Sequence, residues 1–369
     1  MKYSIPLALP DLTGNELKYV SEAIQNNQLS FGSFIDRFEN EFSKLCGTQK
    51  AIVCANGTCA LHLALYALGL KPGDEVIVPS FTYVATANAV RYCGANPVFV
   101  DVDDETWCLN SECIEKAITS RTKGIIPVHL FGHPADMDPI NRLAQIYNLW
   151  VVEDAAEAVL AKYKGRPVGS LGTIGTFSFH SAKVFTSGEG GAITLNDDKL
   201  ESFIRMICSH GMDTKRRFFF PVVGFNYRLT NMSAALLCAQ LERHETILNK
   251  RNKIFEIYTK KLQNIPGISL RPVMPWAKVS PWLFSIVIDS KFGHTREELI
   301  QHLAEEKIEY RPFFIQVHSL PAFRETSIHR GTQLPITDRL CNTGMNLPTY
   351  NTMTSDEVER VIKTIKYLV

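Results

Sequence analysis

Two side chains stand where a folded chain could use them for covalent and acid–base chemistry. Lys183 lies in FSFHSAKVFTSGEGGA, between an aromatic segment and a group of glycines, and Asp154 ends the apolar run WVVED. Burial favours the neutral amine of a lysine, which can attack an aldehyde, while a buried carboxylate needs a cation or an N–H partner. The pair could serve an aldehyde-dependent reaction, although Asp154 could equally cap a helix and most lysines are solvated surface residues.

A third feature offers a site for an anion. The tripeptide Asn56-Gly57-Thr58 ends one predicted strand and opens a helix. Free N–H groups and the helix dipole favour a phosphate there, and glycine lets the backbone approach closely. The alternative is a plain helix cap, since Asn and Thr both serve as N-caps. A Walker loop and a GxGxxG motif are absent, and Gly169, Gly172 and Gly175 are expected to lie in a hairpin.

Together these features match the needs of a pyridoxal 5′-phosphate enzyme. Such an enzyme requires a lysine that bonds to the cofactor, an acid that keeps the ring nitrogen protonated, and a helix N-terminus for the phosphate. Once displaced by the substrate amine, the lysine can also move the proton of the reacting carbon. The combination of Lys183, Asp154 and the Gly57-Thr58 turn therefore predicts this cofactor with more specificity than any one of them.

The elements that must position these residues alternate between short apolar strands and amphipathic helices. Apolar strands between helices are typical of a parallel sheet covered on both faces, which binds ligands beyond the carboxyl ends of its strands. This rule selects residues 56–58, 80–83, His129, Glu153, Asp154 and the region of Lys183. Strands are expected within 51–57, 72–80, 96–103, 124–130, 149–154, 177–183 and 190–197, with helices at 58–70, 82–94 and 136–148.

The second half of the chain indicates a bridge into a smaller α+β region. Residues 231–263 contain neither Gly nor Pro, so one long helix is expected to lead into that region. Further helices are expected at 295–307 and 355–369, and Ser355 with the acidic residues after it suits the start of the last helix.

Composition excludes several classes of function. Lys and Arg total 39 against 38 Asp and Glu, so a nucleic-acid partner is not expected. The nine cysteines are irregularly spaced without a CxxC pair, which favours reduced thiols in the cytoplasm over disulfides or a metal site. No apolar run suits a signal peptide or a membrane span. His129 and His133 lack a completing carboxylate cluster, so they are expected to be packed or hydrogen-bonded rather than metal ligands.

Longer motifs extend this interpretation. EDAAEAV, YKGRPVGSLGTIGTFSFHSAK, TSGEGGAI and GFNYRLTNMSAAL occur in this order, and IPVHLFGHPADMD and NLPTY add to them. Over essentially its whole length the sequence resembles the DegT/DnrJ/EryC1/StrS sugar aminotransferase family. The resemblance implies the type I fold of pyridoxal-phosphate aminotransferases. A large, mostly parallel-sheet domain with an N-terminal arm would span residues 1–245, and a smaller α+β domain residues 246–369. It also implies a homodimer with shared active sites.

The resemblance further implies the roles of residues around the cofactor. Lys183 would bond to the cofactor and carry the proton, and Asp154 would pair with the pyridine nitrogen. Glu157 occupies a position where many members have Gln or His, and would lie near the phenolic oxygen. Tyr83 would stack on the ring.

Phosphate and substrate contacts are implied in the same way. The phosphate would be bound by Gly57, Thr58 and Ser178, together with Asn226 of the partner subunit. Arg311 and His318 lie in a segment similar to one that lines the sugar pocket. The bulky run at 216–221 is either a partly buried loop or a segment that covers substrate.

Several activities are compatible with this family. The sequence looks closest to the branch that uses L-glutamate to aminate C4 of GDP-4-keto-6-deoxymannose, giving GDP-perosamine. The 4-aminotransferases of dTDP-4-keto-6-deoxyglucose are near neighbours. A C3 dehydratase of this fold would have His at the position of Lys183, and a non-catalytic regulatory member would have little reason to keep the three cofactor features. An aminotransferase is therefore expected, while the nucleotide, the sugar configuration and the aminated carbon are left open.

Overall fold

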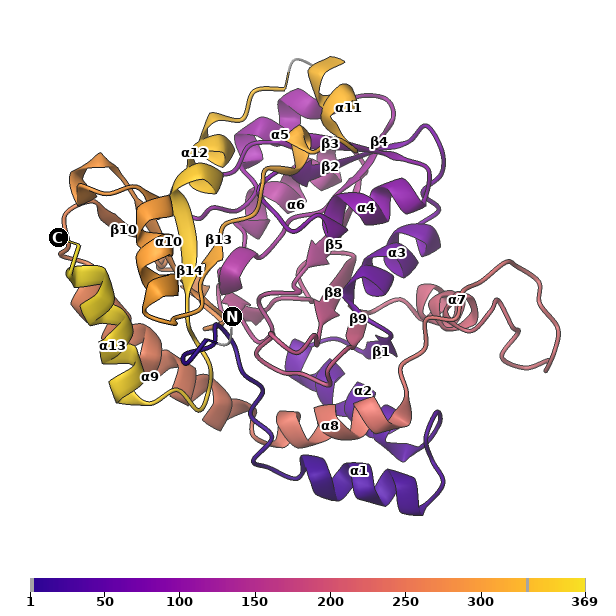
Figure 1. Cartoon of the computed structure of the whole chain (residues 1–369). Helices are drawn as coiled ribbons and strands as arrows, with labels where there is room; N and C mark the ends of the chain where they lie inside the picture. The colour runs from indigo at the N-terminus through magenta and orange to yellow at the C-terminus, as the bar shows by residue number, and fades with distance from the viewer. Residues whose placement is uncertain (1–2, 330–331, 369) are drawn as a thin grey trace.

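Seven strands form the central sheet, in the order β1-β9-β8-β5-β4-β2-β3 (Figure 1). The structure is a computed structural model that describes residues 3–329 and 332–368. Neighbouring strands pair in parallel from β3 to β8, whereas β9 runs against both of its neighbours. The strands are β1 (Lys50–Cys54), β2 (Glu75–Pro79), β3 (Asn96–Val100), β4 (Thr122–Ile125), β5 (Trp150–Asp154), β8 (Ile174–Ser178) and β9 (Gly191–Leu195). The predicted α/β class with a mostly parallel sheet is confirmed.

Helices cover both faces of this sheet. Successive residues of a strand point to opposite faces, so neighbouring strand residues contact different groups of helices. Ile52 of β1 packs with one group of helices, whereas Val53 packs with the other. The first group is α3 (Gly57–Ala67), α4 (Ala85–Tyr92) and α7 (Asp198–Cys208). The second is α2 (Ser33–Cys46), α5 (Ser111–Ala117), α6 (Met137–Ile146) and α8 (Asn231–Glu242), with α1 (Glu16–Gln25) packed on α8.

The C-terminal region has a core of its own, which includes Tyr258, Phe284 and Ile362. Its antiparallel sheet has the order β10-β12-β14-β13. The elements are α9 (His244–Leu262), β10 (Ile268–Leu270), β12 (Phe284–Ile288), α10 (Arg296–Glu305), β13 (Arg311–Pro312), α11 (Arg324–His329), α12 (Pro335–Thr343), β14 (Gly344–Leu347) and α13 (Ser355–Lys366). The boundary predicted after residue 245 falls in the first turn of α9. Val317, Phe323 and Leu334 pack back onto the core beside α3 and α4.

A small sheet joins the two regions. Strand β11 (Ala277–Lys278) pairs with β6 (Lys162–Tyr163), which forms a hairpin with β7 (Arg166–Pro167). In the ranges that the structure describes, no helix combines the length and apolar character needed to cross a membrane.

The expectation of one helix over 231–263 is wrong. Two helices, α8 and α9, meet at Arg243, whose φ of −110° and ψ of 11° are not helical. Its guanidinium forms an ion pair with Asp11 of the N-terminal arm at 3.0 Å. Because neither Gly nor Pro marks the bend, local sequence gives no signal for it, and a contact with a residue far along the chain fixes it.

Two element boundaries also differ from the expected ones. Strand β8 ends at Ser178, so Lys183 lies in a turn, where its N–H donates to the His180 carbonyl at 2.8 Å. The last helix is capped by Thr354 rather than Ser355. The Thr354 hydroxyl accepts from the N–H of Glu357, and the Glu357 carboxylate accepts from the N–H of Thr354.

Candidate active site

A cavity of about 860 Å³ opens at the carboxyl edge of the large sheet. It collects eight of the ten residues predicted for the site, from strand ends, a helix start and the C-terminal region. They are Gly57, Thr58, Tyr83, Asp154, Glu157, Ser178, Lys183 and Arg311. The strand-end rule therefore located the cavity correctly, and the volume is in the range of ordinary ligand sites.

Asp154 is buried at the end of β5 and borders the cavity. The Thr86 hydroxyl donates to its Oδ2 at 2.8 Å, and the Ala156 N–H donates to its Oδ1 at 3.2 Å. Burial raises the pKa of Asp154, while these hydrogen bonds and the Lys183 ammonium act in the opposite direction. A buried carboxylate with this surplus of acceptor capacity is suited to binding a cationic N–H group.

Lys183 and Glu157 form a buried pair, with Nζ 3.7 Å from Oε1. Burial lowers the pKa of Lys183 and raises the pKa of Glu157, although each charge favours the other. The pair can therefore exist as an ion pair or as a neutral amine beside a carboxylic acid. The neutral amine is the nucleophile, and its protonated form is an acid within reach of the cavity.

A strained turn holds Glu157. The N–H of Phe131 donates to Oε2 of Glu157 at 2.9 Å, and Phe131 has a left-handed φ of 45°. This conformation costs an L-residue about 1–2 kcal/mol, so neighbouring contacts must enforce it. Arg271 supplies two of them by donating to the carbonyls of Leu130 at 2.6 Å and Phe131 at 2.9 Å.

The start of α3 forms the anion end of the cavity. The Asn56 side chain accepts from the N–H of Cys59 at 2.9 Å, so the helix-cap interpretation is confirmed. The N–H groups of Gly57 and Thr58 are in the first turn, where a helix provides no acceptor. A Cβ at Gly57 would lie 2.9 Å from Cβ of Ser178, so glycine is what allows β8 to approach. N–H groups beside two hydroxyls fit a phosphate, and with Asp154 and Lys183 the cavity fits pyridoxal 5′-phosphate.

Two residues that sequence reasoning missed also border these groups. Thr86 lies in the first turn of α4 and donates to Asp154, and its hydroxyl lies 3.0 Å from that of Thr82 in the loop before this helix. Trp282 covers Lys183, with the ring centroid 3.9 Å from Nζ. No local pattern marks Trp282, because it reaches the cavity from the C-terminal region.

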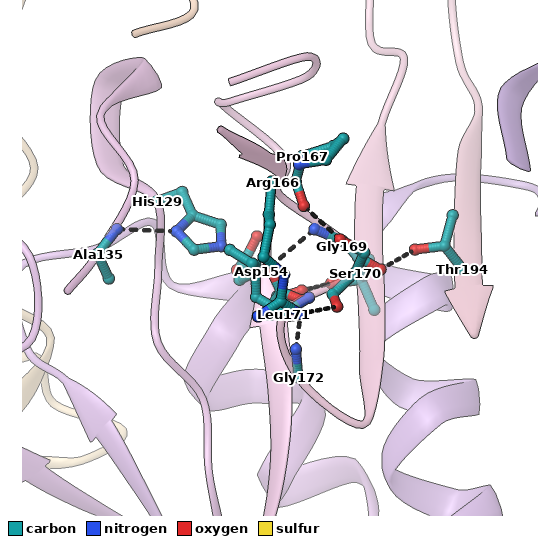
Figure 2. A network of polar contacts seen from close by, with 12 residues as sticks. His129, Ala135, Asp154, Arg166, Pro167, Gly169, Ser170, Leu171, Gly172 and Thr194 are labelled. Carbon is teal, nitrogen blue, oxygen red and sulfur yellow. Dashed lines mark hydrogen bonds and ion pairs between the residues drawn. The ribbon is translucent and has the colours of Figure 1, made fainter. Parts of the chain in front are cut away.

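Glu153 and His129, which the strand-end rule also selected, pair with each other outside the cavity lining. Figure 2 shows His129 and the turn at residues 169–172 that belong to this network. His129 Nε2 lies 3.0 Å from Glu153 Oε2, and the Ala135 N–H donates to Nδ1 at 2.9 Å, so Nε2 is the protonated nitrogen. The N–H groups of Gly169, Leu171 and Gly172 each donate to Glu153 at 2.7 Å. The expectation of a hairpin at Gly169, Gly172 and Gly175 is wrong. Gly169 and Gly172 lie in the turn between β7 and β8, around the buried Glu153 side chain, and Gly175 lies within β8.

The expectation that His129 is hydrogen-bonded is thus confirmed, and His133 is likewise buried, with Nδ1 2.7 Å from the Pro134 carbonyl. Among the described residues, no group of three or more His, Cys, Asp and Glu side chains is placed to hold a metal ion. All nine cysteines are free thiols.

Asn226 and His318 lie outside the lining of this cavity. Asn226 is exposed, and its Oδ1 accepts from Arg228 at 2.9 Å. His318 Nδ1 lies 2.8 Å from the Ser80 hydroxyl, and Nε2 lies 3.7 Å from Asp338. Of the two predicted substrate residues, the structure therefore brings only Arg311 to the cavity within the part of the chain that it describes.

Comparison with known proteins decides the family. The model of the DegT/DnrJ/EryC1/StrS aminotransferase family matches residues 10–366. The chain belongs to this family. GDP-perosamine synthase of Caulobacter vibrioides is 45% identical, over 98% of this chain and 97% of that protein. GDP-perosamine synthase of Escherichia coli O157:H7 is 41% identical, over 99% and 98%.

Solved structures of family members share the fold. DesV of S. venezuelae superposes with a TM-score of 0.92 at 32% identity, covering 100% of this chain and 99% of that one. Spr1654 of Streptococcus pneumoniae, solved in its PLP form, gives 0.92 at 27% identity, covering 99% and 98%. The predicted type I fold is confirmed, and the chain is a pyridoxal 5′-phosphate-dependent aminotransferase of the DegT family.

Proposed function

We propose that this enzyme transfers the amino group of L-glutamate to C4 of GDP-4-keto-6-deoxymannose and thereby forms GDP-perosamine. The observation that carries the proposal is the full-length similarity to GDP-perosamine synthases of three organisms, at 45%, 41% and 37% identity. The cavity supports it, because Lys183, Asp154 and Glu157 converge there beside an anion site.

The cavity geometry supports a proposal for the residues that would hold the cofactor. Asp154 would bind the protonated ring nitrogen, and Thr86 keeps the carboxylate aimed. The α3 N-terminus with Thr58 and Ser178 would bind the phosphate, and Tyr83 would cover the ring. When bound, pyridoxal 5′-phosphate supplies an aldehyde that accepts the amino group and a ring that withdraws electrons from the reacting carbon.

Lys183 supplies the nucleophile and the base. Burial lowers the pKa of Lys183 and so favours the neutral amine, which can take a proton from the reacting carbon and pass it to the cofactor. Glu157 Oε1, at 3.7 Å, stabilises the ammonium that results. Arg311 borders the same cavity and would bind anionic or hydroxyl groups of the substrate.

Glutamate transamination tests the substrate. The purified enzyme is offered GDP- and dTDP-linked 4-keto-6-deoxy sugars with L-glutamate, and 2-oxoglutarate is measured. Product with the GDP-linked mannose derivative supports the proposal. Product with the dTDP-linked glucose derivative alone would identify the enzyme as a dTDP-4-keto-6-deoxyglucose 4-aminotransferase instead. Product with neither substrate would overturn the proposal. A Lys183→Ala chain serves as the blank.

The proposal includes a two-fold homodimer in which Asn226 of the partner subunit completes the phosphate site. Asn226 is exposed and belongs to the segment between α7 and α8. The loop that leaves α7 extends away from the body of the molecule (Figure 1). Phe218, Phe220 and Val223 of that loop are exposed, which is unfavourable in a monomer. The nine free thiols support a reducing cytoplasm as the compartment.

Mixed dimers test the shared site. Lys183→Ala and Asn226→Asp chains should each be inactive, but a mixed dimer has one site with both residues intact and should recover part of the activity. Sedimentation should show a dimer. A fully active monomer, or no recovery from well-mixed chains, would count against a shared site.

A further inference from the structure

We propose that Trp282 is a positioning residue that holds the Lys183 ammonium whenever this amine is not bonded to the cofactor. The indole ring centroid lies 3.9 Å from Nζ, and Trp282 is only 2% exposed. A cation over an aromatic face is attracted by the ring quadrupole, and indole is the best of the aromatic side chains for this contact. The inference rests on the proposed function, in which Lys183 is released and bound again in every cycle.

A second contact ties Trp282 to the same lysine. The indole N–H donates to the carbonyl of Ala182 at 2.6 Å. A buried indole N–H needs an acceptor, and here the acceptor belongs to the residue directly before Lys183. Trp282 thus fixes the backbone at the root of the lysine side chain as well as the charge at its tip. Packing alone would not require both contacts.

Trp282 is itself held rigidly. Arg251 of α9 is buried and donates from Nη1 to the Trp282 carbonyl at 2.7 Å, and from Nε to the side chain of Asn351 at 2.5 Å. The ring also packs against Phe131, with centroids 6.1 Å apart. The ring that faces Lys183 therefore comes from the C-terminal region and is anchored by contacts that do not involve the lysine amine.

Burial and four neighbouring groups set the charge of the released amine. Burial lowers the pKa of Lys183 and so favours the neutral amine, Glu157 and Asp154 favour the ammonium, and Arg311 opposes it. The Trp282 ring adds an attraction for the ammonium. A lysine has many rotamers, and a free one would spend little time aimed at the reacting carbon. Held between the indole face and Glu157, Nζ stays where the next proton transfer needs it.

Chemical titration of Lys183 tests the proposal. The full-length chain is freed of cofactor with hydroxylamine and acetylated briefly with acetic anhydride at a series of pH values, and labelling of Lys183 is quantified by peptide mass spectrometry. The pH midpoint of labelling should fall by about one unit in Trp282→Leu, because the ring favours the charged form. Easier access of the reagent alone would raise the labelling rate without moving the midpoint. Entry of water into the variant pocket would raise the midpoint, because burial lowers the pKa of Lys183, so it cannot produce the expected fall.

A matched control is Trp276→Leu, since Trp276 packs on Tyr163 and His133 in the same region. It should leave the midpoint unchanged. Trp282→Phe retains a ring but loses the N–H, and should give a smaller fall. If Trp282→Leu fails to fold by near-ultraviolet circular dichroism, Trp282→Phe decides. A parental midpoint in either folded variant would overturn the inference.

The proposed function and this inference fail separately. No sugar nucleotide enters the labelling experiment, so an enzyme with another substrate would still show the shift. An enzyme that forms GDP-perosamine but shows no shift would keep its function and lose only the assigned role of Trp282.

Discussion

Two neighbouring carboxylates of β5 differ in how fully the protein satisfies them. Glu153 accepts from three backbone N–H groups and pairs with His129, all within a buried network. Asp154 accepts from Thr86 and Ala156 and borders the cavity. Successive side chains of a strand point to opposite faces, so one residue step separates the two environments.

The difference teaches what makes a buried carboxylate functional. Donors surround Glu153 on all sides, so it binds the turn at 169–172 to the sheet and has no capacity left for a ligand. Asp154 keeps acceptor capacity on the cavity side, where a buried carboxylate without a partner is unfavourable and a cationic N–H group would satisfy it. Glu153 and Asp154 are both acidic residues at the end of β5. The groups around each side chain determine whether it has a structural or a chemical role.

The largest effect that sharpens this comparison is expected from Lys183→Ala. Activity should fall by at least about 10⁴-fold, because nucleophile and base are lost together, while the unfolding midpoint stays near that of the parent. Production of 2-oxoglutarate and denaturant unfolding measure the two quantities. Lys164→Ala is the control, since Lys164 is an exposed lysine paired with Asp138. Activity of Lys183→Ala within tenfold of the parent would remove Lys183 from its role.

Asp154→Asn should act on turnover far more than on stability. A neutral amide cannot keep the cofactor ring nitrogen protonated, so kcat should fall by about two to three orders of magnitude. The free energy of unfolding should change by about 1 kcal/mol or less, because Thr86 can still donate to the amide oxygen. Steady-state kinetics and denaturant unfolding check both. Near-native turnover would show that another group protonates the ring.

Glu153→Gln should give the opposite result. One carboxylate oxygen becomes an NH₂ group that faces backbone N–H donors, which should lower the free energy of unfolding by about 2–4 kcal/mol. The folded fraction should retain kcat within about threefold. If Glu153→Gln instead reduced kcat as strongly as Asp154→Asn, the division between a structural and a chemical carboxylate would be wrong.

Sequence alone predicts the sheet and most of the site because both depend on local patterns. Apolar strands between helices give the parallel sheet, and strand ends bring Asp154, Tyr83 and Thr58 to one edge. The face on which a strand-end residue lies depends on the exact strand register. Residue type alone therefore could not show which of Glu153 and Asp154 faces the cavity.

Other features depend on contacts far apart in the chain. The bend at Arg243 is fixed by Asp11, and Trp282 reaches Lys183 from the C-terminal region. His318 was selected from a motif, but its environment is set by Ser80, which lies in the first quarter of the chain. Such residues carry no local signal of where they will lie.

The comparison extends to the C-terminal region, where Arg311 borders the cavity and His318 is engaged with Ser80. Arg311→Lys should raise KM for the sugar nucleotide about tenfold, because lysine lacks the planar fork that binds two acceptors. His318→Asn should change KM by less than about threefold. Initial rates at saturating L-glutamate measure both. A larger change from His318→Asn than from Arg311→Lys would place His318 in contact with substrate.

The smallest expected effect concerns the pH dependence that Glu157 adds to stability. Burial raises the pKa of Glu157 above its ordinary 4.5, so between 4.5 and the folded value the folded chain binds a proton that the unfolded chain has lost. The stability contributed by Glu157 is therefore present below about pH 4.5 and is lost as the pH rises through the folded pKa. The free energy of unfolding of the cofactor-free parent minus that of Glu157→Gln should fall over this range, by at most about 1.4 kcal/mol per pH unit.

Because the Lys183 ammonium opposes the rise in pKa, the same difference measured in a Lys183→Ala background should continue to fall to higher pH. Denaturant unfolding at half-unit pH steps from 4 to 8 measures both differences. A difference that grows with pH would mean that Lys183 and the Phe131 N–H outweigh burial, and that the folded chain favours the carboxylate form of Glu157.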